Sequence, residues 1–109
     1  MTETRLYLLQ RASAMILAPL VIAHLALIVY AVRGGLTAAE ILSRTQGSLG
    51  WALFYGLFVL TVAVHAPIGL RNILREATAW RGASLNLAMG LFGLLLLGLG
   101  LRAVWAVVA

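Results

Sequence analysis

The 109-residue sequence contains no cysteine, no lysine and no aspartate, and only 10% of its residues are charged. The absence of cysteine excludes disulfides, thiolate metal sites and cysteine-ligated iron–sulfur clusters from this chain. The eight basic residues are therefore all arginine, and they outnumber three glutamates to give a net charge of +5. Any iron–sulfur chemistry connected with this protein must reside on another chain.

Apolar side chains dominate what is present. They make up 63% of the chain, and the mean hydropathy is +1.05, whereas a soluble domain averages about 45–50% apolar and about 25% charged residues. A chain of this length forms one domain, residues 1–109, and is too small to bury so much apolar surface in its own core. A free-standing soluble domain is excluded, and the expected surroundings are a lipid bilayer.

Three apolar runs are long enough to cross a membrane. They cover residues 12–32, 49–70 and 83–101, and an arginine follows each of them. About 20 helical residues span a hydrocarbon core of about 30 Å, and a helix satisfies its own backbone polar groups there. The sequence predicts an all-α membrane protein with three transmembrane helices. The first run is longer than the apolar part of a secretory signal, so we expect it to persist as a span.

The arginines are divided unequally between the two ends of these spans. Five lie before the first span or between the second and third, and three lie at the opposite ends: Arg5, Arg11, Arg71, Arg75 and Arg81 against Arg33, Arg44 and Arg102. Because arginine favours the cytoplasmic side of a membrane, we expect a cytoplasmic N-terminus. The arginines are scattered along segment ends, which argues against nucleic acid as a partner.

The connection between the first two spans, residues 33–48, contains a helix start signal. Thr37 is followed three residues later by Glu40, the spacing of a capping box, which predicts a short helix at the membrane interface. Within the spans, small residues recur as Ala14 with Ala18 and Ala52 with Gly56, and four glycines lie in the third run. Small residues allow membrane helices to approach closely, so they predict bundle packing.

Two histidines, His24 and His65, lie inside the first and second runs. An ionisable residue in a membrane is costly and is often functional. Neither run offers a carboxylate for a proton relay or a nucleophile paired with a base. A neutral imidazole can ligate haem iron, and Arg71, six residues after His65, lies about 9 Å along the helix, within reach of a haem propionate. These residues indicate haem b at His65, and a structural histidine is the alternative.

The two histidines are expected at different depths. His65 lies about 9 Å from the boundary marked by Arg71, whereas His24 lies about 20 Å from Arg11. Axial ligands of one haem sit at similar depth, so we expect the second ligand to come from another subunit. Pro67 can kink the helix and open room for a planar cofactor, although membrane helices also carry proline without such a role.

Two segments resemble a known family. HAPIGLRNILREA, starting at His65, resembles the haem-ligand signature of the small membrane anchor (cytochrome b) subunits of succinate dehydrogenase and fumarate reductase. That signature is a histidine, a glycine four residues later (Gly69), and a helix end that carries arginine and an acidic residue (Arg71 and Glu76). QRASA, starting at Gln10, resembles the segment with which these subunits begin their first span. The length and the three-span layout agree, so the resemblance covers nearly the whole chain.

The resemblance implies a membrane anchor for a flavoprotein subunit and an iron–sulfur subunit, paired with a second membrane anchor subunit in a larger helical bundle. Electrons pass between those subunits and quinone in the bacterial inner (cytoplasmic) membrane, and the dicarboxylate site lies on another chain. His65 would be an axial ligand of haem b iron, and Arg71 would face a propionate. Arg11 and Ser13 would lie near the quinone head group, although anchoring at the inner surface explains Arg11 equally well.

The sequence also departs from the family pattern. Family anchors often carry an Asp-Tyr pair beyond the histidine signature, where this chain has Glu76 and Ala77, and Tyr7 and Trp80 are the nearby aromatic substitutes. His24 has no clear counterpart in single-haem members. It would either ligate the iron of a second haem or pack within the bundle and bond to a backbone carbonyl, and we favour packing.

Other functions remain to be weighed against electron transfer. A haem-free structural membrane anchor is the main alternative. A channel or transporter is disfavoured, because a substrate path usually needs more intramembrane polar groups than two histidines and Asn86.

Overall fold

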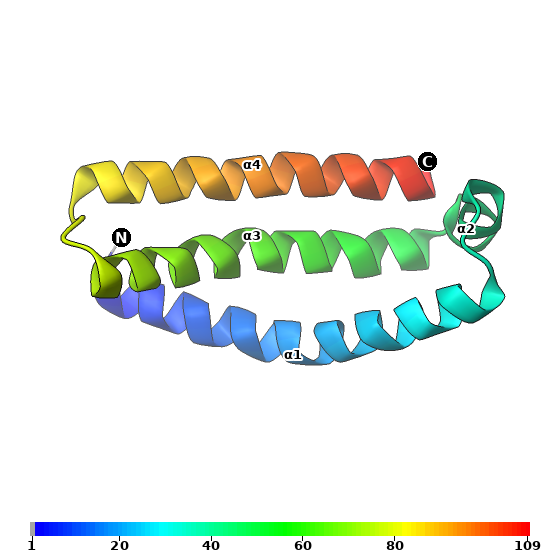
Figure 1. Ribbon diagram of the computed structural model, residues 1–109, viewed down its shortest axis with the longest axis horizontal. Helices are drawn as coiled ribbons and strands as arrows, with labels where there is room; N and C mark the ends of the chain where they lie inside the picture. The colour runs from blue at the N-terminus through cyan, green and yellow to red at the C-terminus, as the bar shows by residue number, and fades with distance from the viewer. Residues whose placement is uncertain (1) are drawn as a thin grey trace.

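The computed structural model describes residues 2–109 as four helices, with no strand in that range. They are α1 (Glu3–Gly34), α2 (Ala38–Thr45), α3 (Leu49–Ala77) and α4 (Ala83–Val108). The three long helices lie side by side, with α3 between α1 and α4 (Figure 1). The all-α prediction is confirmed, and α1, α3 and α4 are each long and apolar enough to cross a membrane.

The long helices reach beyond the apolar runs that predicted them. The starts of α3 and α4 coincide with residues 49 and 83, but α1 begins near the N-terminus and α3 and α4 continue to Ala77 and Val108. The 32 residues of α1 measure about 48 Å at 1.5 Å per residue, more than a hydrocarbon core of about 30 Å. The helix therefore extends past the membrane interior, and Thr2 caps its start by accepting a hydrogen bond from the Arg5 amide.

The short helix α2 closes one end of the bundle (Figure 1). Thr37 accepts a hydrogen bond from the Glu40 amide and donates one to the Glu40 carboxylate, so the predicted capping residues do start a helix. At the other end of α2, the Thr45 hydroxyl donates to the Val107 carbonyl at 2.6 Å, and the Gly47 amide donates to the carbonyl of the last residue of α4 at 2.8 Å. Carbonyls at a helix end lack donors within the helix. Thr45 and Gly47 supply donors to the last two helical carbonyls of α4.

The closest helix packing is between α3 and α4, and it depends on two glycines. A Cβ at Gly100 would lie 2.5 Å from Val59 Cγ1, and one at Gly93 would lie 3.1 Å from the Ala63 carbonyl oxygen. That carbonyl has no helical donor because Pro67 replaces the residue that would supply it. Pro67 is buried and faces Gly93 in α4. The proline ring therefore packs in the contact between α3 and α4.

Few apolar side chains are buried within this chain. Among residues 2–109, the buried large ones are Leu17, Ile68, Leu85 and Met89, while many leucines, isoleucines and valines of the three long helices are exposed. Exposed apolar helices of membrane-spanning length are suited to lipid. The three long helices therefore suit a lipid environment, and few of their apolar side chains are buried against one another.

Candidate functional site

His65 meets Ser13 where α1 crosses α3. The Nδ1 atom of His65 lies 3.1 Å from the Ser13 hydroxyl, which also donates to the Gln10 carbonyl at 3.0 Å. Ser13 is 4% exposed, and His65 is half-buried. Gly69, one turn after His65, leaves room for α1, because a Cβ there would lie 3.2 Å from Gln10 Nε2. The two segments that carry the family resemblance therefore pack against each other.

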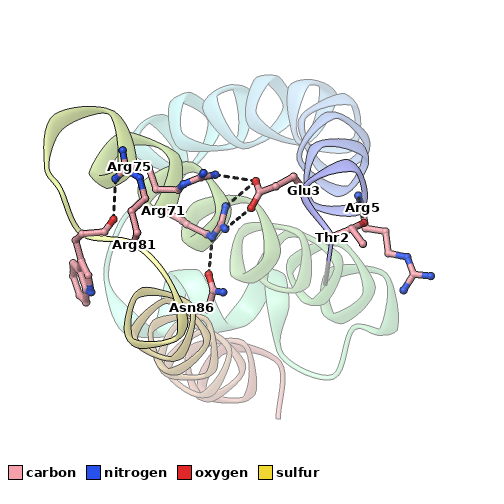
Figure 2. Close-up of polar contacts among 8 residues, drawn as sticks. Thr2, Glu3, Arg5, Arg71, Arg75, Arg81 and Asn86 are labelled. Carbon is pink, nitrogen blue, oxygen red and sulfur yellow. Dashed lines mark hydrogen bonds and ion pairs between the residues drawn. The ribbon is translucent and has the colours of Figure 1, made fainter.

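Arg71 lies further along α3 and joins all three long helices (Figure 2). It is 8% exposed, and its Nε donates to Asn86 Oδ1 of α4 at 2.8 Å. Its Nη2 and Nη1 donate to the two carboxylate oxygens of Glu3, in α1, at 2.6 and 3.2 Å. A guanidinium has five N–H donors. Three of them are used by Glu3 and Asn86, and the other two have no acceptor among residues 2–109.

Glu3 receives a second arginine at the same end of the bundle. Arg75 Nη1 donates to Glu3 Oε2 at 2.9 Å, and the Glu3 side chain is 61% exposed, well before the apolar run that crosses the membrane. The hydrogen bond from Arg71 and the charges of both arginines hold the pKa of the Glu3 carboxyl below its ordinary value. Glu3 is thus ionised at neutral pH and holds two cations at one membrane surface.

A groove of about 540 Å³ runs along the bundle from Arg71 and Asn86. Apart from those two residues, apolar side chains and glycine line it, among them Leu9, Pro67 and Leu94. Its polar end and apolar length suit an elongated amphiphile. His65 does not line this groove, so a ligand of His65 would lie outside it.

Arg11 and Ser13 do not share a surface. Arg11 is exposed, and its guanidinium carbon lies 5.8 Å from the centre of the Tyr7 ring. Ser13 is buried and turned toward His65. The two residues that the resemblance implies near a quinone therefore lie in different surroundings. Trp80, the other aromatic residue that could replace the family's tyrosine, lies just before α4. Its Nε1–H donates to Ser84 Oγ, in the first turn of α4, at 2.8 Å.

His24 occupies a different level of the bundle from His65. Its ring packs against Phe58 with the centroids 5.2 Å apart, and Phe58 precedes His65 by seven residues, or about 10 Å along α3. This agrees with the depth difference expected from the sequence. Within residues 2–109, His24 makes no side-chain hydrogen bond, so the packing that we expected is present and the bond to a backbone carbonyl is not.

The residues at His65 fit one axial position of a haem. A haem ligand needs a neutral imidazole with one free nitrogen, and Ser13 binds Nδ1, which leaves Nε2 for iron. Among residues 2–109 no three side chains of the histidine, aspartate and glutamate type gather to hold a metal ion. His24, the other histidine of the chain, lies about two turns away and is not at the level of His65.

Two features of this region were not predicted. The glutamate that pairs with Arg71 and the groove beside it arise from contacts between helices, for which no sequence spacing gives a signal. Comparison of the chain with protein-family models, curated proteins and solved structures gave no match. The residues and their geometry are therefore the basis for the function proposed below.

Proposed function

We propose that this chain is the membrane anchor subunit of a succinate:quinone oxidoreductase, a succinate dehydrogenase or fumarate reductase, in the bacterial cytoplasmic membrane. The observation that carries the proposal is the contact between Ser13 and His65. The segments QRASA and HAPIGLR resemble the same family but lie 52 residues apart at this contact. Their meeting at one crossing of α1 and α3 supports a shared site.

His65 is the axial ligand that this chain contributes to haem b. Haem b, when bound, carries one electron at a time between its ferric and ferrous states. The imidazole of His65 is held through Nδ1, and Arg71 would face a propionate with one of the N–H groups that Glu3 and Asn86 do not use. A companion membrane anchor supplies the opposite ligand, and the exposed apolar faces of α1 and α4 provide surface for it.

The flavoprotein and iron–sulfur subunits bind at the cytoplasmic end, which holds the N-terminus and the loop between α3 and α4. The iron–sulfur clusters lie on that subunit, because this chain has no cysteine. Arg11, beside Tyr7, contacts the quinone, where a guanidinium stabilises the negative charge that develops on a carbonyl oxygen during reduction. The chain thus helps electrons pass between the iron–sulfur subunit and quinone.

A haem-free structural anchor is the second candidate, and one observation favours it. Arg71 already binds Glu3 and Asn86 and so joins three helices without any cofactor. A family member that lost its haem would keep these contacts.

The two candidate functions differ in whether the complex contains haem iron. We expect the purified complex to show the reduced-minus-oxidised absorption bands of a bis-imidazole haem, and His65→Ala to abolish them. His24→Ala is the matched control, because that ring packs on Phe58 at another level, and it should leave the bands intact. A wild-type complex without haem bands, or a His65→Ala complex that retains them, would contradict the proposal. Loss of half the haem in His24→Ala would assign this histidine to a second haem.

A further inference from the structure

The hydroxyl of Ser13 touches two acceptor-capable atoms, one in its own helix and one in α3. Its Oγ lies 3.0 Å from the Gln10 carbonyl oxygen and 3.1 Å from His65 Nδ1. The side chain is 4% exposed, so neither contact is shared with solvent. The positions of the protons at this site determine which nitrogen of His65 is free.

A hydroxyl carries a single proton, which allows two arrangements. If Ser13 donates to Gln10, then His65 must donate from Nδ1 to Ser13 Oγ, and both short contacts are hydrogen bonds. If Ser13 donates to Nδ1, the contact with Gln10 has no proton, and the proton of His65 sits on Nε2 with no hydrogen-bond partner among residues 2–109. An unpaired N–H in an apolar environment is costly. The first arrangement is therefore favoured.

We propose that Ser13 is a positioning residue that fixes His65 in its Nδ1–H tautomer and leaves the Nε2 lone pair free to bind iron. The identity of the bound group as haem b rests on the proposed function, whereas the tautomer does not. Metal-ligating histidines commonly donate their other N–H to an oxygen atom, which sets the tautomer and the plane of the ring. Ser13 supplies that oxygen from a neighbouring helix.

The surrounding residues hold Ser13 in place. Gln10 and Ser13 lie three residues apart on one face of α1, and His65 and Gly69 lie four apart on one face of α3. The lack of a side chain at Gly69 lets Gln10 lie against α3. A Cβ on Gly69 would lie only 3.2 Å from Gln10 Nε2. This approach brings the hydroxyl of Ser13 to His65.

Nitrogen NMR of the full chain in lipid nanodiscs, without haem and with labelled histidine, tests the tautomer directly. The chain has two histidines, and His24 does not contact Ser13, so it serves as an internal reference. At about pH 8, where an ordinary histidine is neutral, we expect the His65 proton on Nδ1. Ser13→Ala should lower the ratio of Nδ1–H to Nε2–H about tenfold, as the loss of one hydrogen bond would, and Ser13→Thr should preserve it.

A His65 proton on Nε2 in the wild type would overturn the inference. An unchanged tautomer in Ser13→Ala would also overturn it. Circular dichroism of each variant shows whether the helices persist, and the Thr variant tests the hydroxyl in a chain that has kept its packing.

The haem-loaded complex gives a second reading. Donation from Nδ1–H makes the imidazole a stronger electron donor and favours ferric iron, so Ser13→Ala should retain haem at a higher midpoint potential, and Ser13→Thr should restore the wild-type value. If the complex binds no haem while the tautomer still depends on Ser13, the proposed function fails and the tautomer inference stands. If haem binds but Ser13→Ala changes neither the His65 tautomer nor the midpoint potential, the tautomer inference fails and the proposed function stands.

Discussion

At the scale of single residues, several polar side chains within the bundle bond across helix boundaries. Ser13 of α1 contacts His65 of α3, and Arg71 of α3 contacts Asn86 of α4. Lipid offers no hydrogen bonds, so a polar side chain among these helices must find its partner in the protein. Each of these residues therefore fixes how two helices face each other, in addition to any role in ligand binding.

Arg71 and Arg75 offer a matched comparison of this structural role. Both donate to Glu3, but Arg71 is buried and also holds Asn86, whereas the side chain of Arg75 is 36% exposed. Arg71→Met should lower the free energy of unfolding by about 2 kcal/mol, the scale of a lost hydrogen bond to a charged group. Arg75→Met should have little effect, because water solvates that pair. Thermal unfolding of the two variants in detergent measures the difference, and equal losses would show that burial of Arg71 is unimportant.

At the scale of helices, the contact between α3 and α4 depends on missing side chains. Gly93 and Gly100 lie seven residues apart, on the side of α4 that meets Ala63 and Val59 of α3. Gly98, in the same helix, has no atom near the position where a Cβ would be. The glycines of α4 are therefore not equivalent, although the sequence alone does not distinguish them.

Alanine at Gly100 and at Gly98 should have opposite effects. Gly100→Ala places a methyl group 2.5 Å from Val59 Cγ1, and such overpacking costs about 1–3 kcal/mol. Gly98→Ala meets nothing and should stabilise the helix by about 0.5–1 kcal/mol, because alanine loses less backbone entropy than glycine. Thermal unfolding of the two variants in detergent would measure both effects.

A second-site change tests the cause of the loss. Val59→Ala combined with Gly100→Ala should recover stability relative to Gly100→Ala alone, because it removes the two methyl groups that clash. If the double variant were less stable than Gly100→Ala, the contact with Val59 would not be the cause.

The helices could be predicted from the sequence, whereas the contacts between them could not. Apolar length fixed the existence of three long helices, and Thr37 with Glu40 marked α2, because these signals are local. His65 and Arg71 were identified from their positions inside and at the end of an apolar run, and Ser13 only through the family resemblance. Their partners were not, because which faces meet depends on helix crossing and on close approaches such as the one at Gly69. Glu3 lies outside every apolar run and gave no signal of its bond to Arg71.

At the scale of the whole molecule, the two ends of the bundle differ in charge and construction. One end holds the N-terminus and the loop from α3 to α4, with Glu3 binding Arg71 and Arg75 (Figures 1 and 2). The other end is closed by α2, which bonds to the last carbonyls of α4. Five of the eight arginines belong to the first end. This asymmetry favours a cytoplasmic location for it.

The absence of cysteine makes this orientation directly measurable, because any introduced cysteine is the only thiol in the chain. Ala39 in α2 and Ala79 in the loop before α4 are both exposed and lie at opposite ends of the bundle. In intact bacterial cells, a membrane-impermeant maleimide should label Ala39→Cys and leave Ala79→Cys unmodified, because we expect the end with five arginines to face the cytoplasm. Both should react after lysis, which shows that neither thiol is shielded by protein. Labelling of Ala79→Cys alone in intact cells would mean that the flavoprotein and iron–sulfur subunits cannot bind at the end proposed for them.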